Sequence, residues 1–257
     1  MSWEIKQVSK PKLKNPILIE GLPGVGNVGK ITVDFIIDKL RAKKLFEFSS
    51  YNLPHCVFIN EDNLMELPTI EIYYKNLKNK TLLFLAGDIQ PLDEVSCYEF
   101  CNKILDTFEK DKVREIITLG GIALQRIPKS PKVYCTGNSK KIINKYKTNG
   151  ISNKIYGMIG PIIGVSGLLA GLAGKREIPA ISLLAETYAH PTYLGIKGAR
   201  EILKILNKEL DLNINLEELD EEITKIEEEI KTKTNRIRKI QKVKKIPKIS
   251  HDINYIG

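Results

Sequence analysis

Short apolar runs alternate with amphipathic segments along the first 210 residues. The apolar runs predict strands, and several are almost continuously apolar, which is typical of strands covered on both faces. These runs lie at residues 16–20, 56–59, 70–74, 82–86, 115–119, 132–135 and 178–184. Helical periodicity is found between most of them, at residues 28–40, 94–109, 140–147, 164–173 and 197–206.

This alternation of strands and helices predicts the fold class. It indicates an α/β domain over residues 1–210, with a mostly parallel sheet between two helical layers. Residues 48–74 carry strand signals without a helix, so we expect an antiparallel hairpin or an insertion there.

The pattern changes after residue 210. Seven apolar positions recur at steps of three and four and predict a heptad-patterned helix over residues 211–246, with Lys233 interrupting the stripe. They are Leu216, Leu219, Ile223, Ile226, Ile230, Ile237 and Ile240. Such a helix either lies on its own domain or joins an intermolecular bundle, and the pattern fits both. Pro247 ends it, which leaves residues 247–257 as a flexible tail.

Composition narrows the class of protein. A chain of 257 residues with 42% hydrophobic and 28% charged residues is long enough for a substantial core, which excludes general disorder. Its net charge of +9 favours acidic partners. The four cysteines are scattered and the first ten residues lack a signal-like apolar run, so we expect a cytoplasmic protein.

A glycine-rich loop, GLPGVGNVGK at residues 21–30, follows the first predicted strand and opens a helix. Gly24, Gly26 and Gly29 have the spacing of a dinucleotide-binding loop, with Glu47 near the distance of a ribose-binding acid. Gly29 and Lys30 also fit a phosphate-binding P-loop, except that isoleucine occupies the position of the metal-binding hydroxyl. In a third interpretation, which we favour, the glycines let the helix pack closely on the sheet and against another subunit, without a ligand.

Polar residues at other strand ends complete an alternative ligand site. Asp88 follows one apolar run, and Glu186 and His190 follow another. Because connections gather at the carboxyl ends of parallel strands, these side chains and the loop residues Gly24, Gly26, Gly29 and Lys30 define the candidate site of a nucleotide- or phosphometabolite-binding enzyme. We favour the simpler interpretation that the glycines form turns and the acids cap helices.

Residues 155–174 form an uncharged segment long enough to span a bilayer. Its glycines and Pro161 argue against a membrane span and favour a closely packed helix at a subunit contact. The interface candidates are therefore the glycines of both glycine-rich segments and the apolar stripe of the later helix: Gly24, Gly26, Gly29, Gly164, Gly167, Gly171, Leu219, Ile223, Ile226 and Ile230.

Residues suited to metal binding or nucleophilic catalysis are sparse. Cys97 and Cys101 are one helical turn apart, but no second Cys or His pair has zinc-ligand spacing, so we interpret both as buried thiols. Ser166 lacks the spacing of a hydrolase nucleophile. We predict no metal, no cofactor and no catalytic residue.

Four segments together resemble the archaeal proteasome assembly chaperone family. They are GLPGVGNVGK at residues 21–30, LAGDIQP at 85–91, TLGGIA at 118–123 and GPIIGVSGLLAGLAGKREIPAISLLAET at 160–187. The resemblance covers residues 10–245. It implies a three-layer α/β/α domain similar to nucleoside phosphorylases, a helical C-terminal extension, homo-oligomerisation, and docking on the α-ring of the proteasome core particle.

The resemblance also directs attention to the chain end. In proteasome activators and related chaperones, a terminal hydrophobic-tyrosine-any motif inserts between α subunits and its carboxylate pairs with a pocket lysine. Tyr255, Ile256 and Gly257 are the corresponding partner-binding residues here. The sequence departs from the motif, because Tyr255 is third from the end and Asn254 occupies the hydrophobic position.

We therefore expect a homo-oligomeric binding protein that assembles or activates a proteasome core particle and that is not an enzyme. The alternative remains an enzyme using the glycine loop. Nucleic-acid binding through the basic run at residues 231–248 is least favoured, because that run lacks interleaved aromatic residues.

Overall fold

The computed structural model describes residues 3–147, 151–152, 155, 157, 160–221 and 223–224. The chain divides into two compact units, residues 1–214 and residues 215–257. The first unit contains the sheet and its helices. Residues 211–216 are described and are not helical, so the expected heptad helix begins later than predicted. In the second unit, residues 217–221 and 223–224 are helical, whereas the remainder of that predicted helix and the whole tail lie outside the described residues.

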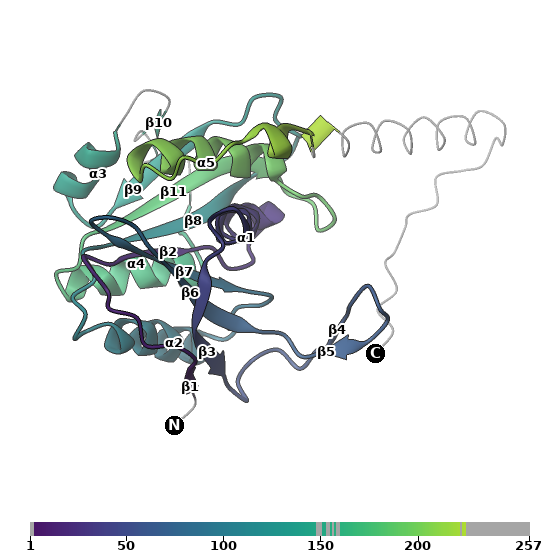
Figure 1. The fold of residues 1–257 in the computed structure, drawn as a ribbon. Helices are drawn as coiled ribbons and strands as arrows, with labels where there is room; N and C mark the ends of the chain where they lie inside the picture. The colour runs from purple at the N-terminus through teal and green to yellow at the C-terminus, as the bar shows by residue number, and fades with distance from the viewer. Residues whose placement is uncertain are drawn as a thin grey trace. The chain divides into compact units, whose positions relative to one another are not determined.

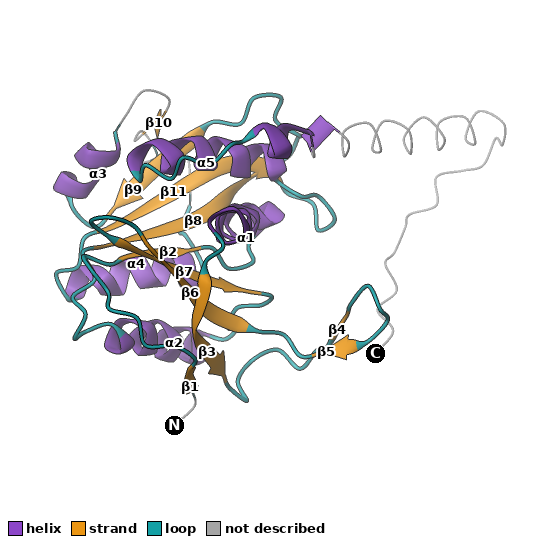
Figure 2. Cartoon of the chain, viewed as in Figure 1, coloured by secondary structure: helices purple, strands orange, loops and turns teal. Residues whose placement is uncertain are grey.

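A nine-stranded sheet forms the centre of the first unit (Figures 1 and 2). Its strands lie in the order β1 (Glu4–Gln7), β3 (Lys43–Ser49), β6 (Ile70–Asn76), β7 (Thr81–Gly87), β2 (Ile17–Glu20), β8 (Glu115–Leu124), β11 (Ala180–Tyr188), β9 (Val133–Gly137) and β10 (Ile151–Ser152).

The sheet is parallel in its middle and mixed overall. Strands β7, β2, β8 and β11 run parallel, as the apolar runs predicted. On one side, β6, β3 and β1 are each antiparallel to the preceding neighbour, and on the other side β9 is antiparallel to β11. The expectation of a mostly parallel sheet therefore holds only for the middle. One cause is the tight turn between β6 and β7, closed by the Leu77 amide on the Lys80 carbonyl at 2.8 Å, because a hairpin reverses direction.

Helices cover both faces of the sheet. Figure 1 shows α1 (Val28–Leu40) and α5 (Ile196–Glu209) on one face and α2 (Glu94–Thr107) and α4 (Val165–Lys175) on the other. The short α3 (Lys140–Tyr146) joins β9 to β10. All five helices overlap the segments predicted from periodicity, and α1 has the predicted bounds.

The core lies along β7, in which every residue is buried. On the α2 face, the Trp3 ring packs on the Phe100 ring with centroids 4.5 Å apart, and Phe48 meets Phe100 edge-on at 5.7 Å. Trp3 is 3% exposed and anchors β1, a strand that the hydrophobic pattern did not predict. The pattern also missed β3, because its lysines and Glu47 interrupt the apolar residues.

The expected hairpin within residues 48–74 is present. Strands β4 (Phe58–Ile59) and β5 (Met65–Glu66) pair antiparallel in a separate two-stranded sheet. Figure 1 shows this hairpin extending away from the main sheet. Among the described residues, no helix is long and apolar enough to cross a membrane, and the described part of residues 155–174 is a loop followed by α4.

Candidate functional site

The carboxyl ends of the four parallel strands lie at one edge of the sheet, which we call the carboxyl edge. The glycine loop follows β2, the segment to α2 follows β7, and the connections to β9 and α5 follow β8 and β11. Ligands of open α/β folds bind at such an edge. The candidate residues of the sequence do fall there, and their contacts decide what the edge can do.

The glycine loop is packed into the fold. A Cβ at Gly29 would lie 2.7 Å from the Leu119 carbonyl oxygen of β8, so α1 sits directly on the sheet. Gly26 has a φ of +63°, and a Cβ there would lie 2.5 Å from Thr187 Oγ1 of β11. Gly24 is exposed and a Cβ there would meet nothing. Two of the three glycines thus serve close packing within the chain, which supports the interpretation without a ligand.

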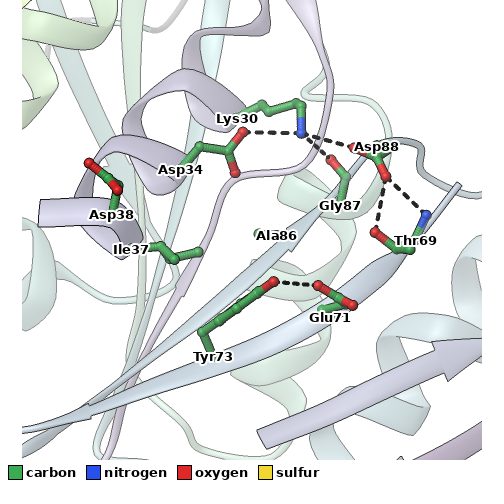
Figure 3. A pocket seen from close by; sticks show the side chains of 10 residues that line it. All are labelled: Lys30, Asp34, Ile37, Asp38, Thr69, Glu71, Tyr73, Ala86, Gly87 and Asp88. Atoms are coloured by element: carbon green, nitrogen blue, oxygen red, sulfur yellow. Dashed lines mark hydrogen bonds and ion pairs between the residues drawn. The ribbon is translucent and has the colours of Figure 1, made fainter. Parts of the chain in front are cut away.

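Lys30 is the residue that a phosphate-binding loop would aim at its ligand. Figure 3 shows its ammonium group among acceptors from α1 and β7 instead. Lys30 Nζ lies 3.0 Å from the Gly87 carbonyl oxygen, 3.1 Å from Asp34 Oδ2 and 3.3 Å from Asp88 Oδ1. The structure therefore brings Lys30 and Asp88 together, as an ion pair that fixes α1 to the end of β7.

A pocket of about 270 Å³ opens beside this ion pair, between α1 and the strands β6 and β7 (Figure 3). Most of its polar side chains already contact one another. Asp88 accepts hydrogen bonds from the Thr69 amide and hydroxyl, both at 3.0 Å, and the Tyr73 hydroxyl donates to Glu71. The pocket offers carboxylates and one neutralised lysine, a set unsuited to an anionic phosphate.

Burial and pairing act in opposite directions on the pKa values of Asp34 and Asp88 in this pocket. Burial raises the pKa of Asp34, and the neighbouring Lys30 lowers it only in part. Burial also acts to raise the pKa of Asp88, but the bonds from Thr69 and the charge of Lys30 outweigh it and hold that pKa below its usual value. Burial, with the hydrogen bond to Glu71, raises the pKa of Tyr73 to about 12, so its hydroxyl keeps its proton.

The other predicted site residues lie further along the same edge. Glu186 accepts from the Lys132 amide at 3.0 Å and from the Tyr134 hydroxyl at 3.1 Å, and thus ties β11 to the start of β9. The His190 ring stacks on the Tyr188 ring, with centroids 5.6 Å apart. Strands β2 and β8 separate these residues from Asp88, a distance of about 14 Å at roughly 4.8 Å per strand. The structure does not bring the alternative ligand site together as one cluster.

The expected ribose-binding acid is also displaced. Glu47 lies on β3 and contacts Lys6 at 2.9 Å and Lys44 at 3.1 Å. Strands β6 and β7 lie between β3 and the strand that carries the glycine loop. Its separation from the loop along the sequence therefore did not translate into proximity in space.

Glu20 is a buried carboxyl group that the sequence analysis did not single out. It ends β2, is fully buried, and accepts from the Leu22 amide through Oε1 at 3.0 Å, while Oε2 has no hydrogen-bond partner. Burial raises its pKa to about 7, and contacts with Leu22, Ser166 and Leu119 offset this rise only in part. The sequence signal is a single acidic residue closing the apolar run PILIE.

The remaining interface candidates have different environments. A Cβ at Gly164 would meet Gln90, and one at Gly167 would meet the Ile162 carbonyl, whereas Gly171 is exposed with open space around it. Leu219 is buried and Ile223 is half-buried. Their role in a subunit contact stays a prediction. Ile226, Ile230, Tyr255, Ile256 and Gly257 lie outside the described residues.

Exposed apolar side chains are found mainly at the carboxyl edge and on the hairpin between β3 and β6. Among the described residues, every large hydrophobic side chain that is exposed, apart from Val8, belongs to a segment at this edge or to the hairpin between β3 and β6. At the edge they are Val25, Leu92, Val95, Tyr98, Ile127, Ile163 and Leu194. These seven side chains share one edge of the sheet, and exposed apolar residues that gather on one surface favour an interaction with another molecule.

Comparisons with known proteins agree on one family. A model described as the PAC2 family matches residues 18–233. An uncharacterized protein of Methanocaldococcus jannaschii is 30% identical over 247 residues, which cover 95% of this chain and 93% of that protein.

Among solved structures, PbaB of Pyrococcus furiosus, described as an archaeal proteasome activator, is 31% identical with a TM-score of 0.82, over 90% of this chain and 98% of that one. PbaA of the same organism, described as an archaeal homolog of proteasome-assembly chaperone, is 25% identical with a TM-score of 0.77, over 94% and 95% of the two chains.

Proposed function

Because this chain belongs to the PAC2 family, we propose that it is a homo-oligomeric binding protein that assembles or activates a proteasome core particle. It docks on the α-ring of that particle through its C-terminal tail and catalyses no reaction. Its location is the cytoplasm, where its partner works.

The observation that carries the proposal is the similarity to PbaB, at 31% identity and a TM-score of 0.82 across 90% of the chain. The proteins named as an activator and as an assembly-chaperone homolog both align over nearly their full lengths. These relatives therefore support a role in which this chain acts on the proteasome. They leave open whether it assembles or activates the particle.

The contacts at the carboxyl edge support a binding role. Lys30 is neutralised by two carboxylates, and Glu186 and His190 are engaged in local contacts. Seven large apolar side chains are exposed at the same edge. A surface of this kind gains free energy by excluding water against another protein.

The basic charge of the chain and the number of tails in an oligomer explain how short tails can hold the protein on the core particle. The nine basic residues between 231 and 248 attract an acidic protein surface and accelerate the encounter. Each tail contributes a weak contact through an aromatic ring and a terminal carboxylate. An oligomer presents several tails at once, so the second and later contacts form at a high effective concentration and the complex gains avidity.

The rival function, an enzyme that binds a nucleotide at the glycine loop, lacks a free cation at the loop itself. Thermal melting with ATP, NAD and nucleosides distinguishes the two. A ligand at 100 times its dissociation constant stabilises a protein by roughly 2.7 kcal/mol. We expect an unchanged melting temperature with each compound, and a clear rise with any of them would favour the enzyme.

Removal of the last four residues tests the docking proposal. We expect a chain lacking residues 254–257 to lose co-purification with the core particle and to keep its oligomeric state in analytical ultracentrifugation. The matched control replaces the same four residues with Gly and Ser, which preserves length but removes the ring. A second control adds two residues after Gly257, which moves the carboxylate. Undiminished binding by the truncated chain would show that the tail is not the docking element.

A further inference from the structure

The hairpin between β3 and β6 is an arm, which we define as residues 50–69. It starts where β3 ends and returns where β6 begins, and β6 begins opposite Gly87 at the end of β7. The arm therefore rises from the carboxyl edge. Figure 1 shows it extending beyond the body of the sheet, with β4 and β5 at its far end.

One face of the arm is apolar and unpartnered. Phe58 pairs with Glu66 and Ile59 with Met65, so Ile59 and Met65 share one face of the pair, and Val57 and Leu67 directly flank the paired residues. These four side chains are 49%, 71%, 78% and 76% exposed. An isolated two-stranded hairpin is marginally stable in water, and a face of this composition is stabilised by covering it.

The arm is nevertheless locally well formed. Asn60 Oδ1 accepts from the Asp62 amide at 3.0 Å and from the Leu64 amide at 2.9 Å, and the Asn60 amide donates to the Leu64 carbonyl at 3.0 Å. Asn63 takes the left-handed conformation with a φ of +59°, which asparagine tolerates. The apolar face is thus presented on a defined turn.

The charged residues of the arm indicate what kind of surface covers its apolar face. The arm contains Glu61, Asp62 and Glu66 and no lysine or arginine, although the whole chain has a net charge of +9. The segment between β8 and β9, residues 125–132, has the opposite character: Arg126, Lys129 and Lys132 surround Ile127, which is 50% exposed. We call this segment the basic loop. Residues 125–132, all of which the structure describes, include no aspartate or glutamate.

The two surfaces lie at the same edge of the sheet but do not cover each other within one chain. The arm rises beside β7, whereas the basic loop follows β8 on the far side of β2. The exposure of Ile59, Met65 and Ile127 shows that each surface is open in the single chain. Each copy carries both halves of a complementary pair, so two copies can exchange contacts reciprocally.

We propose that the apolar face of the arm docks on the basic loop of a second copy of this chain, with Glu61 and Asp62 facing Arg126 and Lys129. This inference deepens the proposed homo-oligomer and rests on it. The apolar side chains supply the contact area, and the opposite charges fix the register and suppress wrong pairings.

Charge reversal in the full-length protein tests the contact without disturbing the core, because all four charged residues are exposed. One variant carries Glu61→Lys and Asp62→Lys, and the other carries Arg126→Glu and Lys129→Glu. We expect each alone to weaken self-association about tenfold at low salt, measured by sedimentation velocity across a concentration series. An equimolar mixture of the two variants regains association, because each reversed arm then meets a reversed loop.

An apolar control separates docking from general surface effects. Ile59→Glu weakens association, whereas Val8→Glu leaves it unchanged. Val8 is 47% exposed and follows β1 toward the opposite end of the sheet. Circular dichroism checks that each variant is folded.

The outcomes distinguish the inference from the proposed function. A wild-type chain that is monomeric at every concentration overturns the homo-oligomer and this contact together. An oligomer unaffected by both reversals overturns only the arm contact. Variants that remain oligomeric but lose co-purification with the core particle also overturn it, because the arm then serves a different protein.

Discussion

Glu20 provides the most direct test of the energetics at the carboxyl edge. Its side chain is fully buried, one carboxyl oxygen has no hydrogen-bond partner, and its pKa is raised to about 7 by burial. Glutamine has the same shape and keeps an acceptor for the Leu22 amide. The Glu20→Gln variant therefore imitates the protonated side chain at every pH.

The sign of the effect follows from proton binding. The folded state keeps the Glu20 proton up to about pH 7, whereas the unfolded chain loses it near the ordinary value of 4.5. Stability is therefore complete below pH 4.5 and falls as the pH rises towards 7, because the unfolded state releases a proton that the folded state retains. At roughly 1.4 kcal/mol per pKa unit, the loss amounts to about 3 kcal/mol.

Urea denaturation of wild type and variant between pH 4 and pH 9 measures this difference. We expect equal free energies of unfolding near pH 4 and an advantage of about 3 kcal/mol for Glu20→Gln above pH 8. A constant offset between the two curves, or a variant that is less stable at pH 8, would refute the reasoning.

The other buried glutamate is the matched control. Glu115 is 3% exposed and contacts Lys145, Arg114 at 3.2 Å and the Tyr146 hydroxyl at 3.1 Å. Because its charge is paired, Glu115→Gln removes ion pairs and lowers stability at neutral pH. The two substitutions thus have opposite signs.

Three further predictions concern the glycine loop and the cysteines. Gly29→Ala places a Cβ 2.7 Å from the Leu119 carbonyl and lowers the free energy of unfolding by about 1–3 kcal/mol, whereas Gly24→Ala, which meets open space, changes it by less than about 0.5 kcal/mol in the same urea titration. Lys30→Met lowers the free energy of unfolding by about 1 kcal/mol, and the variant protein has the same melting temperature with or without ATP. If ATP raised the melting temperature of the wild type and not of the variant, the nucleotide-binding interpretation would be supported instead. In native protein a thiol reagent labels exposed Cys56 promptly and reaches buried Cys97, Cys101 and Cys135 only on unfolding, so fast labelling of all four would contradict the packing of α2 and β9.

Local patterns were sufficient for much of the fold. The apolar runs and the helical periodicity located α1, α2, α4, α5 and the parallel strands, because both periodicities arise within a single element. The resemblance of four segments also pointed to the family whose model matches residues 18–233. Strands β1 and β3 were not predicted because polar residues interrupt their apolar positions, and because the contacts of Trp3 and Phe48 with Phe100 join residues far apart in the sequence.

The roles of individual site residues needed the tertiary structure. The spacing of Gly24, Gly26, Gly29 and Lys30 fitted both a nucleotide loop and a packing loop, of which the sequence analysis favoured the second. The assembled sheet supports the packing interpretation, because it places the Leu119 carbonyl against Gly29 and two carboxylates around Lys30. Spacing along a chain does not specify which distant backbone will meet a residue.

The amino-acid sequence by itself determined the order of elements, the unequal charge of body and tail, and the family. The tertiary structure decided that each polar residue at the strand ends has its own local partners, and that the arm and the basic loop are left uncovered at one edge. The physical reason is that burial and pairing are properties of residues far apart in sequence. They exist only after the sheet has brought those residues together.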